Sequence, residues 1–165
     1  MENFIKLMLA FGIGLLLVLL AMPKVIPFLH KMKFGQVERE EGLESHKKKG
    51  GTPTMGGVVF VLAAVIAAFV VNYKNITNPN LILITIVLVG YSLIGFIDDA
   101  LIILKHQNEG LKAWQKFLMQ AILAVGCYLY LENFVPGFTT EVTIPIVKVN
   151  IDFGWFYAVL VFIMF

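Results

Sequence analysis

Five long stretches without a charged side chain alternate with short polar segments along this chain. They lie between Lys6 and Lys24 (17 uncharged residues), Lys49 and Lys74 (24), Lys74 and Asp98 (23), Lys116 and Glu132 (15), and after Asp152 (13). A helix needs about 20 apolar residues to cross the hydrocarbon core of a bilayer. The pattern predicts an all-α integral membrane protein, a polytopic helix bundle in one domain, with spans near 4–23, 54–73, 80–97, 114–131 and 153–165.

The last two stretches are shorter than a full span. In the fourth, Lys116 can snorkel outward, and Trp114, Tyr128 and Tyr130 are placed for the two membrane interfaces. The fifth would leave a terminal carboxylate near the middle of the membrane, which is costly. We therefore expect the chain to be part of a longer protein, cut within its fifth span.

The segment between these two stretches has the alternation of a strand. Apolar residues recur at every second position on either side of Pro145 and Ile146, where a turn would fall. This pattern predicts a small β-hairpin, with an irregular loop as the alternative.

Composition supports a membrane location, and charge gives the orientation. The chain is 59% hydrophobic and 15% charged, against about 25% charged residues in a typical soluble domain. Ten of the 13 lysines and arginines fall between the first and second or the third and fourth stretches. Because basic loops stay in the cytoplasm, we expect the N-terminus outside and these two loops inside. We also expect no nucleic-acid partner.

A basic segment precedes the second predicted span. Lys49 is followed by the run from Gly51 to Gly57, in which Thr52 is the expected N-cap and Pro53 the first helical residue. A helix N-terminus with glycines and a lysine favours phosphate binding. The alternative is that the lysines only anchor the helix to anionic lipid.

An acidic pair, Asp98 and Asp99, follows the third predicted span. Two carboxylates at the C-terminal end of a helix repel each other and its dipole, so a cation should offset them. Mg²⁺ combines one or two carboxylates with substrate phosphates. The pair thus favours phosphoryl transfer, with an inert, solvated helix end as the alternative.

Several motifs together resemble the phospho-N-acetylmuramoyl-pentapeptide transferase (MraY) family of bacterial cell-wall synthesis. They are the run from Gly51 to Gly57, the run from Gly95 to Asp99, Lys33 to Gln36, Glu44 to His46 with Lys49, and Asn108, Gly110 and Leu111. The resemblance covers the whole chain and corresponds to the N-terminal half of the family.

The resemblance implies a Mg²⁺-dependent enzyme of the bacterial inner membrane. Such an enzyme moves phospho-MurNAc-pentapeptide from UDP to undecaprenyl phosphate, making lipid I and UMP. Matching positions assign Asp98 and Asp99 to catalysis and metal binding. They assign Lys49, Thr52, Thr54 and Asn108 to the substrate site, while Lys105 is a candidate phosphate ligand, since Ile102 replaces the family's usual lysine.

Two alternatives remain open from the sequence. The chain could belong to a related transferase that uses UDP-N-acetylhexosamine, or to a non-catalytic membrane subunit. Because the family's later motifs are absent from these residues, we also expect the chain alone to be inactive. A second copy of the chain, in a homodimer, is also a possible partner.

Overall fold

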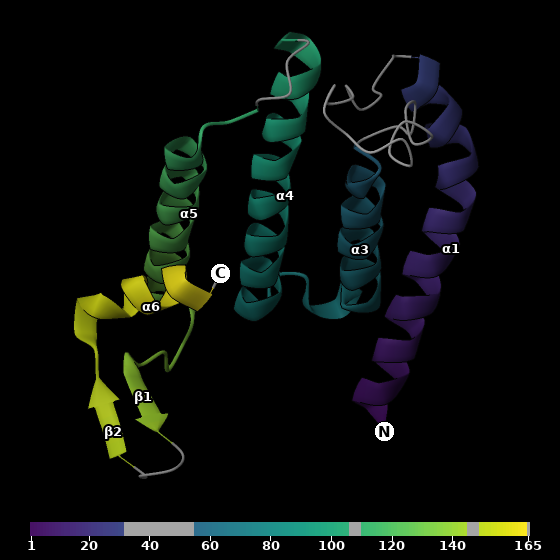
Figure 1. Ribbon diagram of the computed structural model, residues 1–165. Coiled ribbons are helices and arrows are strands. Elements are labelled where there is room, and N and C mark those ends of the chain that lie inside the picture. The colour runs from purple at the N-terminus through teal and green to yellow at the C-terminus, as the bar shows by residue number, and fades with distance from the viewer. Residues whose placement is uncertain (32–54, 106–109, 145–148, 165) are drawn as a thin grey trace. The chain divides into compact units, whose positions relative to one another are not determined.

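The computed structural model describes residues 1–31, 55–105, 110–144 and 149–164, and these residues are mainly helical (Figure 1). The described elements are, in chain order, α1 (Glu2–Lys31), α3 (Gly57–Val71), the 3₁₀ turn η1 (Tyr73–Asn75), α4 (Pro79–Lys105), α5 (Ala113–Phe134), β1 (Glu141–Ile144), β2 (Val149–Asp152), the 3₁₀ turn η2 (Gly154–Phe156) and α6 (Tyr157–Met164).

The chain divides into two compact units. Unit 1 contains Met1–Ile76 and Tyr91–Lys112, and unit 2 contains Thr77–Gly90 and Ala113–Phe165. Helix α4 contributes its first half to unit 2 and its second half to unit 1.

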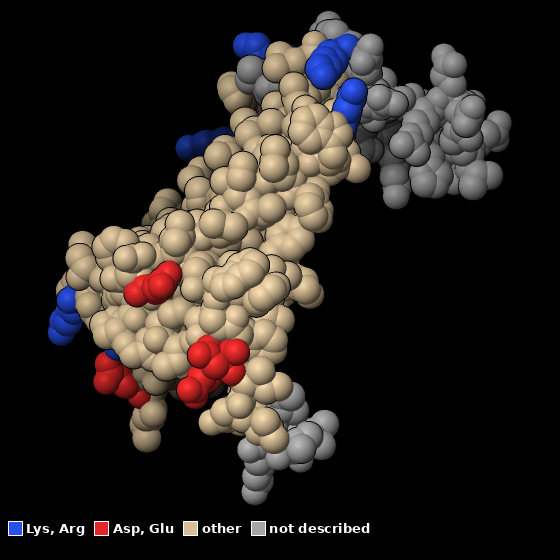
Figure 2. Space-filling view, turned by 90° about the vertical axis from the view of Figure 1, so that its left-hand side faces the viewer, with Lys and Arg blue, Asp and Glu red and all other residues tan. Residues whose placement is uncertain are grey.

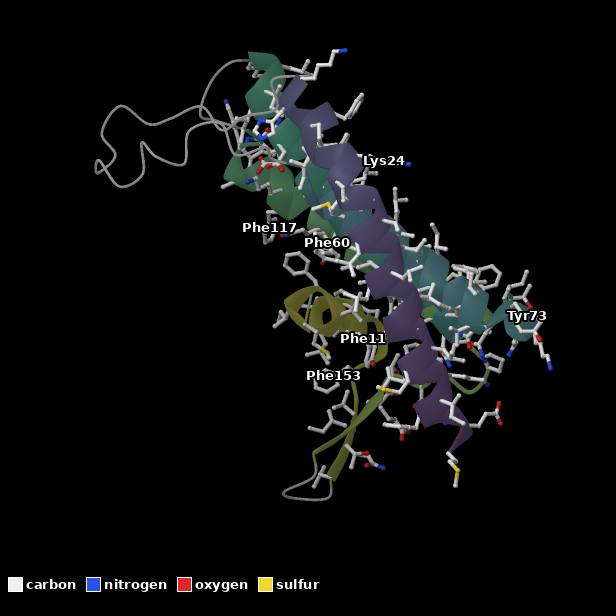
Figure 3. The ribbon with its side chains drawn as sticks, turned by 90° about the vertical axis from the view of Figure 1, so that its right-hand side faces the viewer. Phe11, Lys24, Phe60, Tyr73, Phe117 and Phe153 are labelled. Atoms are coloured by element: carbon white, nitrogen blue, oxygen red, sulfur yellow. The ribbon has the colours of Figure 1, made fainter. Side chains whose placement is uncertain are left out.

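Three of the helices are long and apolar enough to cross a membrane. They are α1, α4 and α5, with 30, 27 and 22 residues. Most of the described surface visible in Figure 2 is uncharged, and large apolar side chains such as Phe11, which is 66% exposed, project from α1 (Figure 3). These features confirm the predicted all-α membrane fold. Helix α3 is apolar but has only 15 residues, about 22 Å at 1.5 Å per residue.

Helix α1 continues beyond the predicted span, which ended at residue 23. It passes through Pro23 and Pro27 and ends at Lys31, so Lys24 lies within the helix and is exposed. A span ends where charge begins, whereas a helix ends where its backbone hydrogen bonds end. The two boundaries therefore differ by about two turns here.

In unit 1, α1 packs against α3 through small residues. Ala63 and Ala67 of α3 are only 4% and 3% exposed, and a Cβ placed on Gly14 of α1 would lie 3.9 Å from the Cβ of Ala67. Small residues four apart let two apolar helices approach closely where no hydrophobic effect drives them together.

In unit 2, α6 packs against α5. Ala124 and Cys127 of α5 are 1% exposed and form a cluster with Val161 of α6. Tyr128 packs with the rings of Phe138 and Tyr157, both at 6.4 Å between centroids. Tyr128, which we expected at a membrane interface, therefore packs against other aromatic side chains of unit 2.

The predicted β-hairpin is confirmed. Strands β1 and β2 pair antiparallel, with Val142 opposite Ile151 and Ile144 opposite Val149. The Thr143 hydroxyl donates to Asn150 Oδ1 across the pair at 2.9 Å. Pro145 and Ile146, the predicted turn, lie outside the described residues.

Candidate functional site

A pocket in unit 1 brings together the two segments that the sequence marked as chemically important. Its volume is about 300 Å³. One wall comes from the start of α3 and the other from the second half of α4. The lining residues are Met55, Gly57, Val58 and Val61 on the first wall and Ser92, Gly95, Phe96, Asp98 and Asp99 on the second.

The acidic pair does not stand at the end of its helix, as we had expected from the sequence. Helix α4 continues to Lys105, six residues past Asp99. Because the dipole acts within the last turn of a helix, the expected conflict of the carboxylates with the dipole does not arise. The repulsion between the two neighbouring carboxylates remains.

Asp98 also binds the segment that precedes α5. The backbone N–H of Leu111 donates to Asp98 Oδ1 at 2.7 Å, and both groups are partly buried. A hydrogen bond to an ionised acceptor is stronger than one between neutral groups. It fixes one oxygen of Asp98.

The start of α3 also differs from its prediction. The helix begins at Gly57 with Gly56 as N-cap, later than the predicted start at Pro53, which lies outside the described residues. The physical reason is Met55, whose φ of 70° is incompatible with a helix running through it. Thr52 itself lies outside the described residues.

This helix start offers fewer backbone donors than expected. The N–H groups of Val58 and Val59 donate to the carbonyls of Met55 and Gly56 at 3.3 and 3.2 Å. They are therefore already engaged in the turn. Backbone strain at a non-glycine residue such as Met55 clusters at functional sites in proteins, and Met55 lines the pocket.

The predicted substrate-binding residues are only partly placed by the structure. Lys49, Thr52, Thr54 and Asn108 lie outside the described residues. Lys105 is described and exposed at the end of α4, about 9 Å further along the helix axis than Asp99. It does not line the pocket.

Ser92, Val58 and Val61 line the pocket but were not singled out from the sequence. Ser92 precedes Asp99 by seven residues, which is two helical turns, so both lie on one face of α4. This spacing could have identified Ser92 from the sequence. Val58 and Val61 could not have been identified in this way, since an apolar residue in an apolar helix does not reveal which face lines a pocket.

The acidic pair is compatible with a divalent cation. Among the residues that the structure describes, no group of three or more His, Cys, Asp and Glu side chains lies together. Mg²⁺ does not require such a group, because it combines one or two carboxylates with water and substrate phosphates. Two carboxylates lining one pocket therefore fit this ion.

Comparison with a family signature supports the importance of the α3 wall. Residues 49–61 match phospho-N-acetylmuramoyl-pentapeptide-transferase signature 1. This range contains all four α3-side residues that line the pocket, Met55, Gly57, Val58 and Val61. It also contains Lys49, Thr52 and Thr54.

Whole-chain comparisons agree with the signature. The chain is 42% identical over 159 residues to a phospho-N-acetylmuramoyl-pentapeptide-transferase of Halalkalibacterium halodurans, covering 96% of this chain and 48% of the relative. For relatives of the same name from Bacillus subtilis and Staphylococcus epidermidis the identities are 41% and 44%, covering 92% and 93% of this chain and 46% and 47% of each relative. The resemblance predicted from the sequence is confirmed. The chain spans about half the length of these relatives.

Proposed function

We propose, from its similarity to phospho-N-acetylmuramoyl-pentapeptide-transferases, that this chain supplies one part of a lipid-linked phosphosugar transfer site. In the complete protein, phospho-MurNAc-pentapeptide would pass from UDP to undecaprenyl phosphate, giving lipid I and UMP for peptidoglycan synthesis. One observation carries the proposal: four residues of the family signature and the acidic pair line one pocket.

Transfer between two phosphates concentrates negative charge. The carboxylates of Asp98 and Asp99 add to this charge, so a cation must accompany the substrates. We propose that Asp98 and Asp99 hold Mg²⁺, with substrate oxygens and water completing its shell. When bound, the ion would neutralise charge on the diphosphate.

The two carboxylates point in different directions from α4 and so receive different roles. Adjacent helix positions point about 100° apart, and Asp98 is oriented by the Leu111 N–H. We propose that Asp98 keeps a fixed orientation in the site. Asp99 is assigned to the incoming lipid phosphate, either as its general base or through the ion.

The nucleotide side of the reaction is assigned to the residues before α3. Lys49, Thr52 and Thr54 fall within the matched signature, and Lys49 supplies a full positive charge for a diphosphate. We assign Asn108 to substrate binding and Lys105 to the role of the lysine that Ile102 replaces. These roles rest on the motif positions.

The proposed reaction also requires an orientation. A nucleotide-linked donor is too polar to cross the bilayer, so the site lies on the cytoplasmic face of the bacterial inner membrane. The ten basic residues of the two loops support this placement through the positive-inside rule. The N-terminus and the hairpin then lie outside.

The acidic pair provides the test. In the complete protein, Asp98→Asn and Asp99→Asn should each lower Mg²⁺-dependent UMP release from UDP-MurNAc-pentapeptide by about 100-fold or more, the scale of losing one charge-stabilising group. Asp152→Asn is the matched control, because it changes an exposed aspartate in the hairpin of unit 2. Undiminished activity in both variants would remove the pair from the mechanism.

The same assay tests the substrate. A protein that released UMP only from UDP-N-acetylhexosamine would belong to the related transferases, and the specific assignment would fail. A protein that bound the nucleotide without turnover would fit the non-catalytic alternative.

A further inference from the structure

Gly110 lies against Asp98 more closely than any residue with a side chain could. A Cβ built on Gly110 would fall 2.8 Å from Cγ and 2.9 Å from the backbone oxygen of Asp98. Real Cβ atoms essentially never approach other heavy atoms below 3.0 Å. The next residue, Leu111, makes the 2.7 Å hydrogen bond to the Asp98 carboxylate.

The need for glycine here is one of space and not of backbone conformation. The described glycines with positive φ are Gly137 and Gly154, and Gly110 is not among them. An alanine could therefore adopt the local backbone. It would collide with Asp98, and a rotation of the carboxylate alone would not relieve the contact with the backbone oxygen.

We propose that Gly110 is a positioning residue for the catalytic carboxylate of Asp98. Its missing side chain lets the backbone of residues 110 and 111 lie against α4. The Leu111 N–H then holds Asp98 in the pocket. This inference rests on the proposed function and adds a specific role for the segment just before α5.

The competing explanation is that Gly110 only shapes the connection into α5. In that case an added methyl group would affect folding but would not separate kcat from KM. Positioning makes a different prediction, because the methyl group displaces either the N–H donor or the carboxylate that it orients. Displacing a catalytic group by about 1 Å can cost up to about 100-fold in rate.

The experiment compares Gly110→Ala with Gly126→Ala in the complete protein. Gly126 lies on α5, and a Cβ added there meets nothing within 4 Å, so it controls for the general effect of replacing glycine. The measurements are hydrogen exchange of the Leu111 amide and the steady-state constants for UMP release. We expect faster Leu111 exchange and a kcat lowered about 10- to 100-fold in Gly110→Ala, with KM for the nucleotide within twofold and Gly126→Ala unchanged in both.

Two results would overturn the inference. Unchanged Leu111 exchange in Gly110→Ala would show that the close contact is not needed for the hydrogen bond. Faster exchange with an unchanged kcat would show that the bond does not position a catalytic group.

Exchange in Asp98→Ala, which removes the acceptor without adding bulk, tests the bond if Gly110→Ala does not fold. Unchanged Leu111 exchange there would also overturn the inference. Failure of the proposed function would look different: the unmodified protein would release no UMP, whereas the exchange results would still report on the contact.

Discussion

At the scale of single residues, the acidic pair takes its surroundings from two other segments of the chain. We expected Asp98 and Asp99 to oppose a helix dipole, yet α4 continues to Lys105. What the structure provides is a hydrogen bond from Leu111 to Asp98 and a shared pocket with the start of α3. Neither contact can be read from two adjacent aspartates.

A second glycine, Gly90 in unit 2, also depends on space. A Cβ at this position would lie 2.7 Å from both terminal carbons of Leu123. We predict that Gly90→Val destabilises the protein by about 1–3 kcal/mol, the usual cost of overpacking. Thermal unfolding in detergent measures this, with Gly126→Val as the control in open space. Adding Leu123→Ala to Gly90→Val should recover part of the loss, and equal midpoints for the two valine variants would contradict the prediction.

The hairpin carries a pH-sensitive contact. Hydrogen bonds from the Thr140 hydroxyl and from the backbone N–H of Gly154 hold the pKa of Asp152 below its usual 3.8. A depressed pKa means that the ionised form is favoured in the folded state. Its contribution to stability is therefore present above about pH 4 and is lost as the pH falls through the lower folded value.

We predict that the Gly154 amide shift, followed by NMR, titrates with a midpoint below 3.8. Asp152→Asn should abolish the titration. A midpoint at or above the ordinary value would show that the two hydrogen bonds do not favour the carboxylate.

At the scale of elements, small residues decide how the apolar helices pack. Helix α3 is apolar on every side, so hydrophobicity does not distinguish the face that meets α1. The structure selects Ala63 and Ala67, four residues apart and nearly fully buried, opposite Gly14. Close packing of small residues thus provides the specificity that hydrophobicity lacks in this helix.

This contact predicts different tolerance at neighbouring alanines. Ala67→Leu should lower the unfolding midpoint, since the added carbons must enter the packed contact with α1, at about 1–3 kcal/mol. Ala64→Leu is the matched control, because Ala64 is exposed and leucine suits both a helix and a lipid-facing surface. Thermal unfolding measures both variants. If they are equally stable, the α1–α3 contact is not as close as the structure places it.

At the scale of the whole molecule, the proposed orientation is open to direct test. Cys127 is the single cysteine of the chain and is 1% exposed, so labels should not reach it. We predict that a membrane-impermeant maleimide modifies Thr143→Cys in intact cells. It should modify Lys48→Cys only after the membrane is opened. The reverse pattern would invert the topology and place the proposed site on the wrong face for a nucleotide donor.

The broad features of this protein could be predicted from its amino-acid sequence. Uncharged stretches of sufficient length predicted apolar membrane helices because unpaired charge is too costly in hydrocarbon. The alternation around Pro145 predicted the hairpin. The run from Gly51 to Gly57 and the acidic pair indicated the family resemblance and two candidate segments for the site.

The contacts of these segments became known only from the folded chain. Helix boundaries at Lys31, Gly57 and Lys105 differ from the predicted span limits, because backbone hydrogen bonding, not charge, ends a helix. Three contacts join residues that are distant in the chain. They are the packing of Ala67 against Gly14, the pocket that Val61 and Asp99 both line, and the contact of Gly110 with Asp98. Such contacts depend on shape at close range, which a one-dimensional pattern of apolar and polar residues does not encode.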